Sequence, residues 1–203
     1  MIYEVLVTVK ADATEDQIKD IKTIVTENVD SVKGSILISD DWGMMMFAQS
    51  LSGKHQRGKY IYFMYKSSGT INKEIIRKLS INETAIRYLI VQVGEDRFEE
   101  TFVKEYQNPH HTTNADNMLD EELEKDRKMF SKKRSCWFSA NKTKPDWKNP
   151  KTYSWLLNEF GKISPARVSG LRPRFQRMSN DAIKRGRMMG LVSFVSDETA
   201  YRA

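Results

Sequence analysis

Charge is sorted along this chain by position, and the sorting constrains its organisation more than any other feature. Residues 1–94 carry a net charge of +1, residues 95–130 carry −6, and residues 131–203 carry +11. This arrangement predicts a near-neutral domain at 1–94, an acidic linker at 95–132 and a basic module at 133–203. The basic module is expected to bind a polyanion.

The stretch from Gly161 to Phe194 concentrates the positive charge. Pro173 suits the first turn of a helix, where its missing N–H costs little. Apolar residues then recur on one side of that helix, at Phe175, Met178, Ala182 and Met189, and cations gather on roughly the opposite half. Arginine suits phosphate contacts because its guanidinium forms two hydrogen bonds at once. The predicted phosphate-binding residues are Lys162, Arg167, Arg172, Arg174, Arg177, Lys184, Arg185 and Arg187, with Lys133 and Arg134 as weaker candidates.

Residues 1–94 alternate between strand-like and helix-like patterns in the order β-α-β-β-α-β. Thr14 and Gln17 have the spacing of a capping box, so a helix should begin there. Strands are expected at 2–9, 35–50, 59–66 and 85–93, and a second helix at about 71–79. Right-handed crossovers then give an α+β, ferredoxin-like domain in which two helices cover one face of a four-stranded antiparallel sheet.

The rest of the chain has weaker patterns. The acidic segment at 95–132 is poor in periodic hydrophobic residues, which is typical of a linker that is at most partly helical. The basic module holds a small group of aromatic residues and a helix expected at 150–159, so the fold continues as a small, mainly helical unit. The aromatic and apolar residues of this group are Trp147, Tyr153, Trp155, Leu156, Leu157 and Phe160.

Residues that could carry chemistry are few. Cys136 is the only cysteine, and His110 and His111 are adjacent, so the chain offers no zinc-binding spacing and no nucleophile–base pair. We therefore expect no enzyme activity, no metal and no cofactor. No apolar run reaches the 18 residues or more that a membrane helix needs.

Two alternative functions stay open at this level. RRM domains share the βαββαβ order and stack RNA bases on aromatic residues of the sheet, and the stretch KYIYFMYK at 59–66 is rich in such residues. This alternative predicts that Tyr60 and Tyr62 are exposed. The second alternative, a small enzyme of ferredoxin-like fold, would require polar side chains that converge in a cleft.

Two families are suggested by specific motifs. The order GKISPARVSG, RFQR and AIKRGRMMGLVSF resembles bacterial small-subunit ribosomal protein eighteen over residues 133–196. Residues 1–94 resemble small-subunit ribosomal protein six. The motifs of that second resemblance are Tyr3-Glu4, DWG at 41–43, Phe47-Ala48, Lys59-Tyr60 and INETAIR at 81–87.

A fusion of these two families would have a defined role. The resemblance implies a structural constituent of the small ribosomal subunit that binds the central, or platform, domain of its rRNA. It also implies other small-subunit ribosomal proteins as partners and an intramolecular contact between the two modules. The expected location is the ribosome, in a bacterial cytoplasm or in an organelle.

Overall fold

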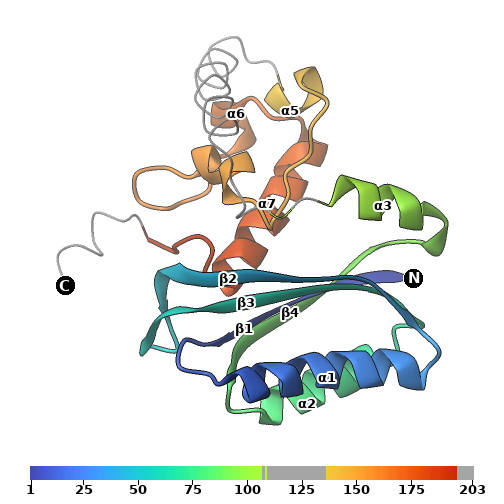
Figure 1. The fold of residues 1–203 in the computed structure, drawn as a ribbon. Coiled ribbons are helices and arrows are strands. Elements are labelled where there is room, and N and C mark those ends of the chain that lie inside the picture. Colours follow the sequence, from blue (N-terminus) through green and yellow to red (C-terminus); the bar gives the residue numbers. More distant parts are fainter. Residues whose placement is uncertain (107, 109–135, 196–203) are drawn as a thin grey trace. The chain divides into compact units, whose positions relative to one another are not determined.

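The chain forms two compact units in a computed structural model that describes residues 1–106, 108 and 136–195 (Figure 1). Unit 1 comprises Met1–Asn108 and unit 2 comprises Pro109–Ala203. Each unit has its own buried residues and its own secondary structure, and each is described here by itself. Within the described residues, no helix combines the length and apolarity that crossing a bilayer requires.

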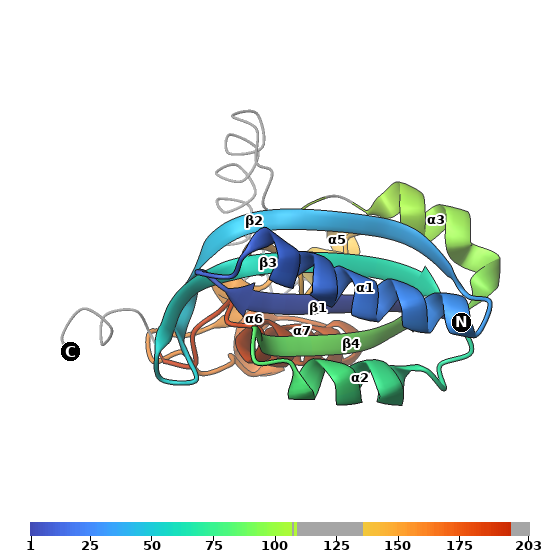
Figure 2. The same ribbon diagram turned by 60° about the horizontal axis from the view of Figure 1, so that its bottom comes forward.

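Unit 1 is an antiparallel sheet with two helices on one of its faces, as Figures 1 and 2 show. The four strands lie in the order β2-β3-β1-β4. They are β1 (Ile2–Lys10), β2 (Ser35–Leu51), β3 (His55–Lys66) and β4 (Ala85–Gly94), and the helices are α1 (Glu15–Ser31) and α2 (Asn72–Ile81). The ferredoxin-like βαββαβ fold predicted from the sequence is confirmed.

The core of unit 1 lies between the sheet and the two helices. Successive side chains of a strand point to opposite faces, so alternate residues of β1 and β3 turn toward α1 and α2. The strand residues of this core include Val5, Val7, Val9, Ile61, Phe63 and Tyr65, and the helix residues include Ile18, Ile21, Val25, Val29, Ile75 and Leu79. Burial of this apolar surface stabilises the sheet–helix packing at roughly 25 cal/mol per Å².

Helix α1 begins where the capping box predicts. The Thr14 hydroxyl accepts the backbone N–H of Gln17 at 3.3 Å, and the Gln17 side chain accepts the backbone N–H of Thr14 at 3.0 Å. These bonds satisfy two N–H groups that the start of a helix otherwise leaves without partners.

The long strand β2 bends at Gly43, whose φ of 80° lies in the left-handed region. The pairing of β2 with β3 shifts register between Asp41 and Gly43, and the Asp41 carboxylate accepts the Gly43 N–H at 2.9 Å. The extra residue turns Trp42 onto Tyr60 and Tyr62 of β3, with ring centroids 6.1 and 5.7 Å away.

The segment directly after β4 is folded, although the sequence predicted a linker from residue 95. It forms the short helix η1 (Asp96–Phe98) and the helix α3 (Glu99–Glu105). Phe102 packs so closely on Gly94 that a Cβ at that glycine would lie 2.8 Å from its ring. Lys66 and Glu99 form an ion pair at 3.0 Å. Phe98, Phe102 and Tyr106 recur every four residues, which is the spacing of one helix face.

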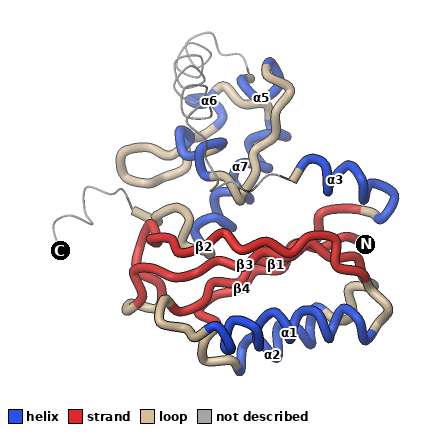
Figure 3. The backbone as a smooth tube through the Cα atoms, viewed as in Figure 1, coloured by secondary structure: helices blue, strands red, loops and turns tan. Residues whose placement is uncertain are grey.

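Unit 2 is built from short helical pieces around one long helix (Figure 3). The pieces are α5 (Trp137–Ala140), η2 (Pro150–Thr152), η3 (Ser154–Leu156) and α6 (Ala166–Ser169), and the long helix is α7 (Pro173–Met188). The single helix predicted at 150–159 is wrong: Tyr153, with φ −138° and ψ −8°, interrupts it and leaves two 3₁₀ turns. The Asn149 side chain caps the first turn by accepting the Lys151 N–H at 3.1 Å.

Candidate nucleic-acid interface

Helix α7 packs through small residues as much as through large apolar ones. Its buried residues are Ser179, Ala182, Ile183 and Gly186, whereas Phe175 and Met178 of the predicted stripe are half-buried. Gly186 touches the Tyr153 hydroxyl so closely that a Cβ would overlap it. Tyr153 is itself fixed, because it is fully buried and its hydroxyl donates to the Trp147 carbonyl at 3.0 Å. The centre of the packing face therefore lies nearer to Ser179 and Gly186 than hydrophobicity alone predicts.

The opposite side of α7 is a cationic surface. Arg174, Arg177 and Lys184 are exposed on it, and so is Asp181, the only acidic residue of the helix. The intervals of three and four residues between neighbours place these side chains on one side of a helix. We call Arg174, Arg177 and Lys184 the cationic face. Such a row of guanidinium and ammonium groups can contact successive phosphates of a nucleic-acid backbone.

Other predicted contact residues lie around this helix rather than on its exposed side. Lys162 is exposed in the turn before α6, Arg167 is exposed on α6, and Arg172 is exposed at the N-cap of α7. Arg185 is half-buried on the flank of the helix. Lys133 and Arg134 lie outside the described residues.

Arg187 differs from the other predicted cations because its guanidinium bonds to the chain itself. It donates to the carbonyl oxygen of Gly161, and to that of Ser193 at 3.3 Å. It also lies over the Phe194 ring, 5.5 Å from the centroid. Burial lowers the pKa of Arg187 from its ordinary value. Arg187 therefore joins the end of α7 to two turns of unit 2, which the sequence did not predict.

A groove lies beside the N-terminal end of α7, with a volume of about 380 Å³. Its apolar part is formed by Phe138, Phe175 and Met178, and cationic side chains from two segments of the chain surround it. The remaining lining residues are Ser139, Lys142, Thr143, Lys144, Arg172 and Arg174. Sequence reasoning missed Lys142 and Lys144 because they lie about 30 residues before the other cations, outside the densest cluster.

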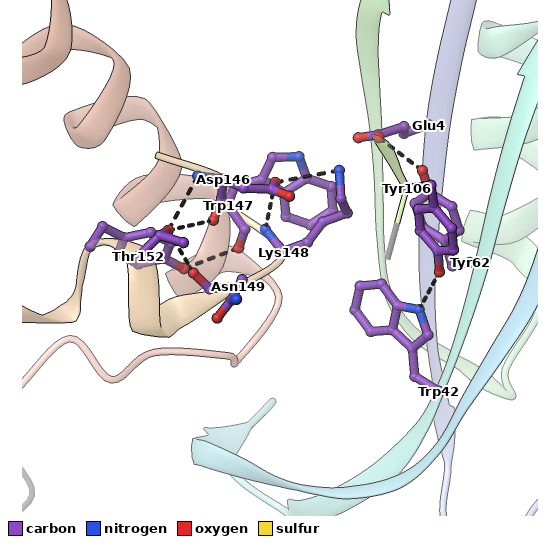
Figure 4. Close-up of polar contacts among 10 residues, drawn as sticks. Glu4, Trp42, Tyr62, Tyr106, Asp146, Trp147, Lys148, Asn149 and Thr152 are labelled. Carbon is purple, nitrogen blue, oxygen red and sulfur yellow. Dashed lines mark hydrogen bonds and ion pairs between the residues drawn. The ribbon is translucent and has the colours of Figure 1, made fainter. Parts of the chain in front are cut away.

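The loop at 146–152 is held by its own polar contacts (Figure 4). The Thr152 hydroxyl accepts the Asp146 N–H at 3.2 Å and donates to the Asn149 carbonyl at 2.8 Å. The Asp146 carboxylate pairs with Lys148 at 3.4 Å. These bonds position Trp147, the residue whose carbonyl holds Tyr153 against α7.

The cysteine is part of the packing of unit 2. Cys136 is buried at the start of α5. Burial raises the pKa of its thiol, but hydrogen bonds from Arg172, Ser139 and Phe138 outweigh burial and lower the pKa overall. No three histidine, cysteine or acidic side chains of the described residues come together as metal ligands. His110 and His111 lie outside those residues.

Aromatic residues of the sheet in unit 1 contact one another (Figure 4). Tyr60 and Tyr62 are buried, contrary to what the RRM-like alternative requires. Tyr62 stacks on Trp42 and on Tyr106, and its hydroxyl donates to the buried Glu4 carboxylate at 2.8 Å. Burial raises the pKa of Tyr60 above its ordinary value. The rings serve the packing of the domain.

Both units match family models. Residues 2–92 match the model described as Ribosomal protein S6, and residues 141–192 match the model described as Ribosomal protein S18. For each family there are relatives at least 30% identical, most of whose length this chain covers. The chain belongs to both families. It is a fusion of an S6 domain and an S18 domain, and it has the structural ribosomal role of those families.

The S6 domain is similar to the small ribosomal subunit protein bS6 of Geotalea daltonii. The two are 30% identical over 95 residues, which are 47% of this chain and 73% of that protein. A crystal structure of 30S ribosomal protein S6 from Thermotoga maritima is also similar, at 22% identity and a TM-score of 0.42. The similarity covers 51% of this chain and 94% of that one.

The S18 domain is similar to two proteins named small ribosomal subunit protein bS18. That of Herpetosiphon aurantiacus is 38% identical over 73 residues, which are 36% of this chain and 85% of that protein. That of Staphylococcus aureus is 41% identical over 68 residues, which are 33% of this chain and 85% of that protein. Both named families are structural components of ribosomes rather than enzymes.

Proposed function

We propose that the fusion binds the platform domain of small-subunit rRNA, mainly through the S18 domain. The observation that carries this proposal is the cationic face of α7, which is exposed while the opposite side of the helix is buried. Backbone phosphates of folded RNA lie at regular intervals, and arginine contacts them through charge-assisted hydrogen bonds. Lys162, Arg167 and Arg172 extend the proposed surface beyond the helix. Few base-specific contacts are expected from this surface.

Substitution of two arginines tests the rRNA proposal. The double variant Arg174→Ala and Arg177→Ala should bind a platform rRNA fragment more weakly by more than about 1 kcal/mol. Its log–log salt dependence should also be shallower, by roughly one to two units, because fewer counterions are released. Filter binding of the full chain at several salt concentrations measures both quantities.

A matched control removes the same charge elsewhere. Lys19 and Lys73 are exposed on the helices of the S6 domain, so Lys19→Ala with Lys73→Ala also removes two positive charges. This control should keep most of the affinity. Equal losses in both double variants, or a flat salt response of the unaltered chain, would contradict binding through the cationic face.

We also propose that the two domains act as a tethered pair on the ribosome. An S6 domain and an S18 domain are joined in this one chain. A covalent connection raises the effective concentration of one domain near the other. Other small-subunit ribosomal proteins are expected as neighbours. The tethered pair would act in the same way on a bacterial or an organellar ribosome.

Cleavage of the connection tests the tether. A chain cut near Asn117 should still assemble both halves on platform rRNA, but at a higher protein concentration than the intact chain needs. Mixing the two halves with the RNA and titrating them measures that shift. Failure to assemble at any concentration would mean that the connecting segment is itself a structural part of the complex.

A further inference from the structure

The groove beside α7 has a composition that phosphate binding alone does not require. Its apolar wall is made by Phe175 and Met178, with Phe138 stacked behind Phe175 at a centroid distance of 5.6 Å. Lys142, Lys144, Arg172 and Arg174 surround that wall, and all four are exposed. No acidic residue is among the lining residues. A phosphate backbone would contact only the cations and would leave the apolar wall exposed to water.

An unpaired nucleotide matches both parts of the groove. A base has an apolar face that stacks on aromatic side chains, and its phosphate carries the negative charge that the surrounding cations attract. The groove volume of about 380 Å³ falls within the range of roughly 300–1,000 Å³ that is usual for small-ligand sites. Arg174 belongs both to the groove and to the cationic face, so one strand of RNA can follow α7 and place a nucleotide here.

The backbone at Lys142 adds a second observation. Lys142 has φ +53°, in the left-handed region where glycine is favoured, and it follows α5 in a turn closed by a 3.1 Å bond from the Thr143 N–H to the Phe138 carbonyl. A glycine would adopt this turn without strain. The lysine side chain therefore imposes a conformational cost at a position that faces the groove, and such outliers often mark functional sites.

We propose that this groove binds one unpaired nucleotide of the small-subunit rRNA. The base stacks on Phe175 beside Met178, and its phosphate is held by Lys142, Lys144 and Arg174. The inference rests on the proposed rRNA binding and adds to it a place where the protein contacts a base.

Crosslinking provides a direct test. The full chain bound to a platform rRNA fragment is irradiated at a wavelength that joins stacked bases to aromatic rings, then both polymers are digested and analysed by mass spectrometry. The expected product is a single nucleotide attached to Phe175. Crosslinks that involve other residues of the chain and never Phe175 would overturn the proposal.

Two substitutions give an independent measurement. Phe175→Leu keeps an apolar side chain against Phe138 but removes the stacking surface, so binding to the rRNA fragment should weaken roughly tenfold. Lys142→Gly relieves the backbone strain and removes one charge, so it should weaken binding a few-fold without lowering the melting temperature. The exposed Lys73 of α2, changed to alanine, is the matched control for one lost charge and should bind nearly as the unaltered chain does.

The outcomes separate this inference from the function on which it rests. If Lys142→Gly and Phe175→Leu bind as tightly as the unaltered chain while the Arg174 and Arg177 double variant binds weakly, the nucleotide groove is wrong and rRNA binding stands. If the unaltered chain does not bind platform rRNA, both are wrong. If Lys142→Gly loses affinity only in proportion to folded protein lost, the lysine is structural and the groove proposal fails.

Discussion

Tyr106 lies parallel to Tyr62, with ring centroids 4.7 Å apart and an angle of 11° between the ring planes. Its hydroxyl accepts the Trp42 indole N–H at 3.0 Å and donates to the Asp40 carboxylate at 2.7 Å. The Asn108 side chain donates to the same carboxylate at 2.9 Å. Tyr106 and Asn108, which follow α3 in the chain, are therefore part of the S6 domain and cover its sheet near Tyr62 and Asp40.

This contact predicts that Tyr106 contributes to the stability of the S6 domain. Tyr106→Phe removes two hydrogen bonds and keeps the stacked ring, so the free energy of unfolding should fall by about 1 kcal/mol. Tyr106→Ala also removes the ring and should cost about 2 kcal/mol. Hydrogen exchange of S6-domain peptides in the full chain measures these local free energies.

A nearby surface substitution serves as the control for Tyr106. Lys104 has a side chain that is 78% exposed and an ion pair with Glu100 at 3.6 Å. Lys104→Ala should change the stability by less than about 0.5 kcal/mol. If Tyr106→Ala has no larger effect than this control, Tyr106 does not belong to the domain and the linker begins earlier.

Gly186→Ala should destabilise the S18 domain, although alanine favours helices. Replacing a glycine inside a helix by alanine normally stabilises the helix by roughly 1 kcal/mol. Here the new methyl group would overlap the Tyr153 hydroxyl, and such overpacking costs about 1–3 kcal/mol. Hydrogen exchange of α7 peptides measures the sum of the two effects.

A second substitution isolates the cause at Gly186. Tyr153→Phe removes the hydroxyl that the methyl group would strike, so Gly186→Ala should be tolerated better in that background than alone. A coupling free energy near zero in this double-mutant cycle would show that the two residues do not crowd each other.

Asp181→Asn should strengthen binding to platform rRNA. Asp181 is exposed on the same side of α7 as Arg177 and Lys184, and its charge repels phosphate and neutralises part of the cationic face. We expect about threefold tighter binding at low salt, and a smaller difference at high salt because exposed charges are screened. Asp20→Asn, an exposed position on α1, is the charge-matched control and should leave the affinity unchanged.

Thr14→Ala should weaken α1 and the sheet packing that depends on it. The substitution removes the hydroxyl that accepts the Gln17 N–H, at a cost of about 1 kcal/mol. Thr23→Ala is the control, since its hydroxyl bonds the Lys19 carbonyl in the middle of the same helix, where alanine is favoured. A greater loss from Thr23→Ala than from Thr14→Ala would refute the capping argument.

The S6 domain could be predicted from the sequence because its signals are local. Alternation over 2–9 and the β-prone residues at 59–66 indicate two of the strands, and Thr14 with Gln17 indicates the start of α1. The helical structure directly after β4 was not predicted, because the sequence indicated a linker from residue 95. Its helix is short and its net charge is negative, so the four-residue spacing of its aromatic residues is a weak signal. The contacts of Phe102 with Gly94 and of Tyr106 with Tyr62 depend on the folded sheet.

The candidate interface could be predicted only in part for a different reason. The number of cations in α7 is visible in the sequence, but their availability depends on packing. Arg187 bonds to the chain itself, because the carbonyl of Gly161, which is 26 residues away in the sequence, and that of Ser193, just after α7, both lie beside its guanidinium. Lys142, Lys144 and Arg174 likewise line the same groove although they come from two separate segments of the chain. No local sequence pattern indicates that these segments lie close together.

The close approach of Gly186 to Tyr153 has a consequence for genetics. Both residues are uncharged and buried in the S18 domain, and a larger side chain at Gly186 would push α7 away from Tyr153 and change the direction in which its arginines point. A screen for defects in ribosome assembly should therefore recover substitutions at Gly186 and Tyr153 alongside substitutions of the arginines. Some of the recovered substitutions would then lie at buried positions that do not contact RNA.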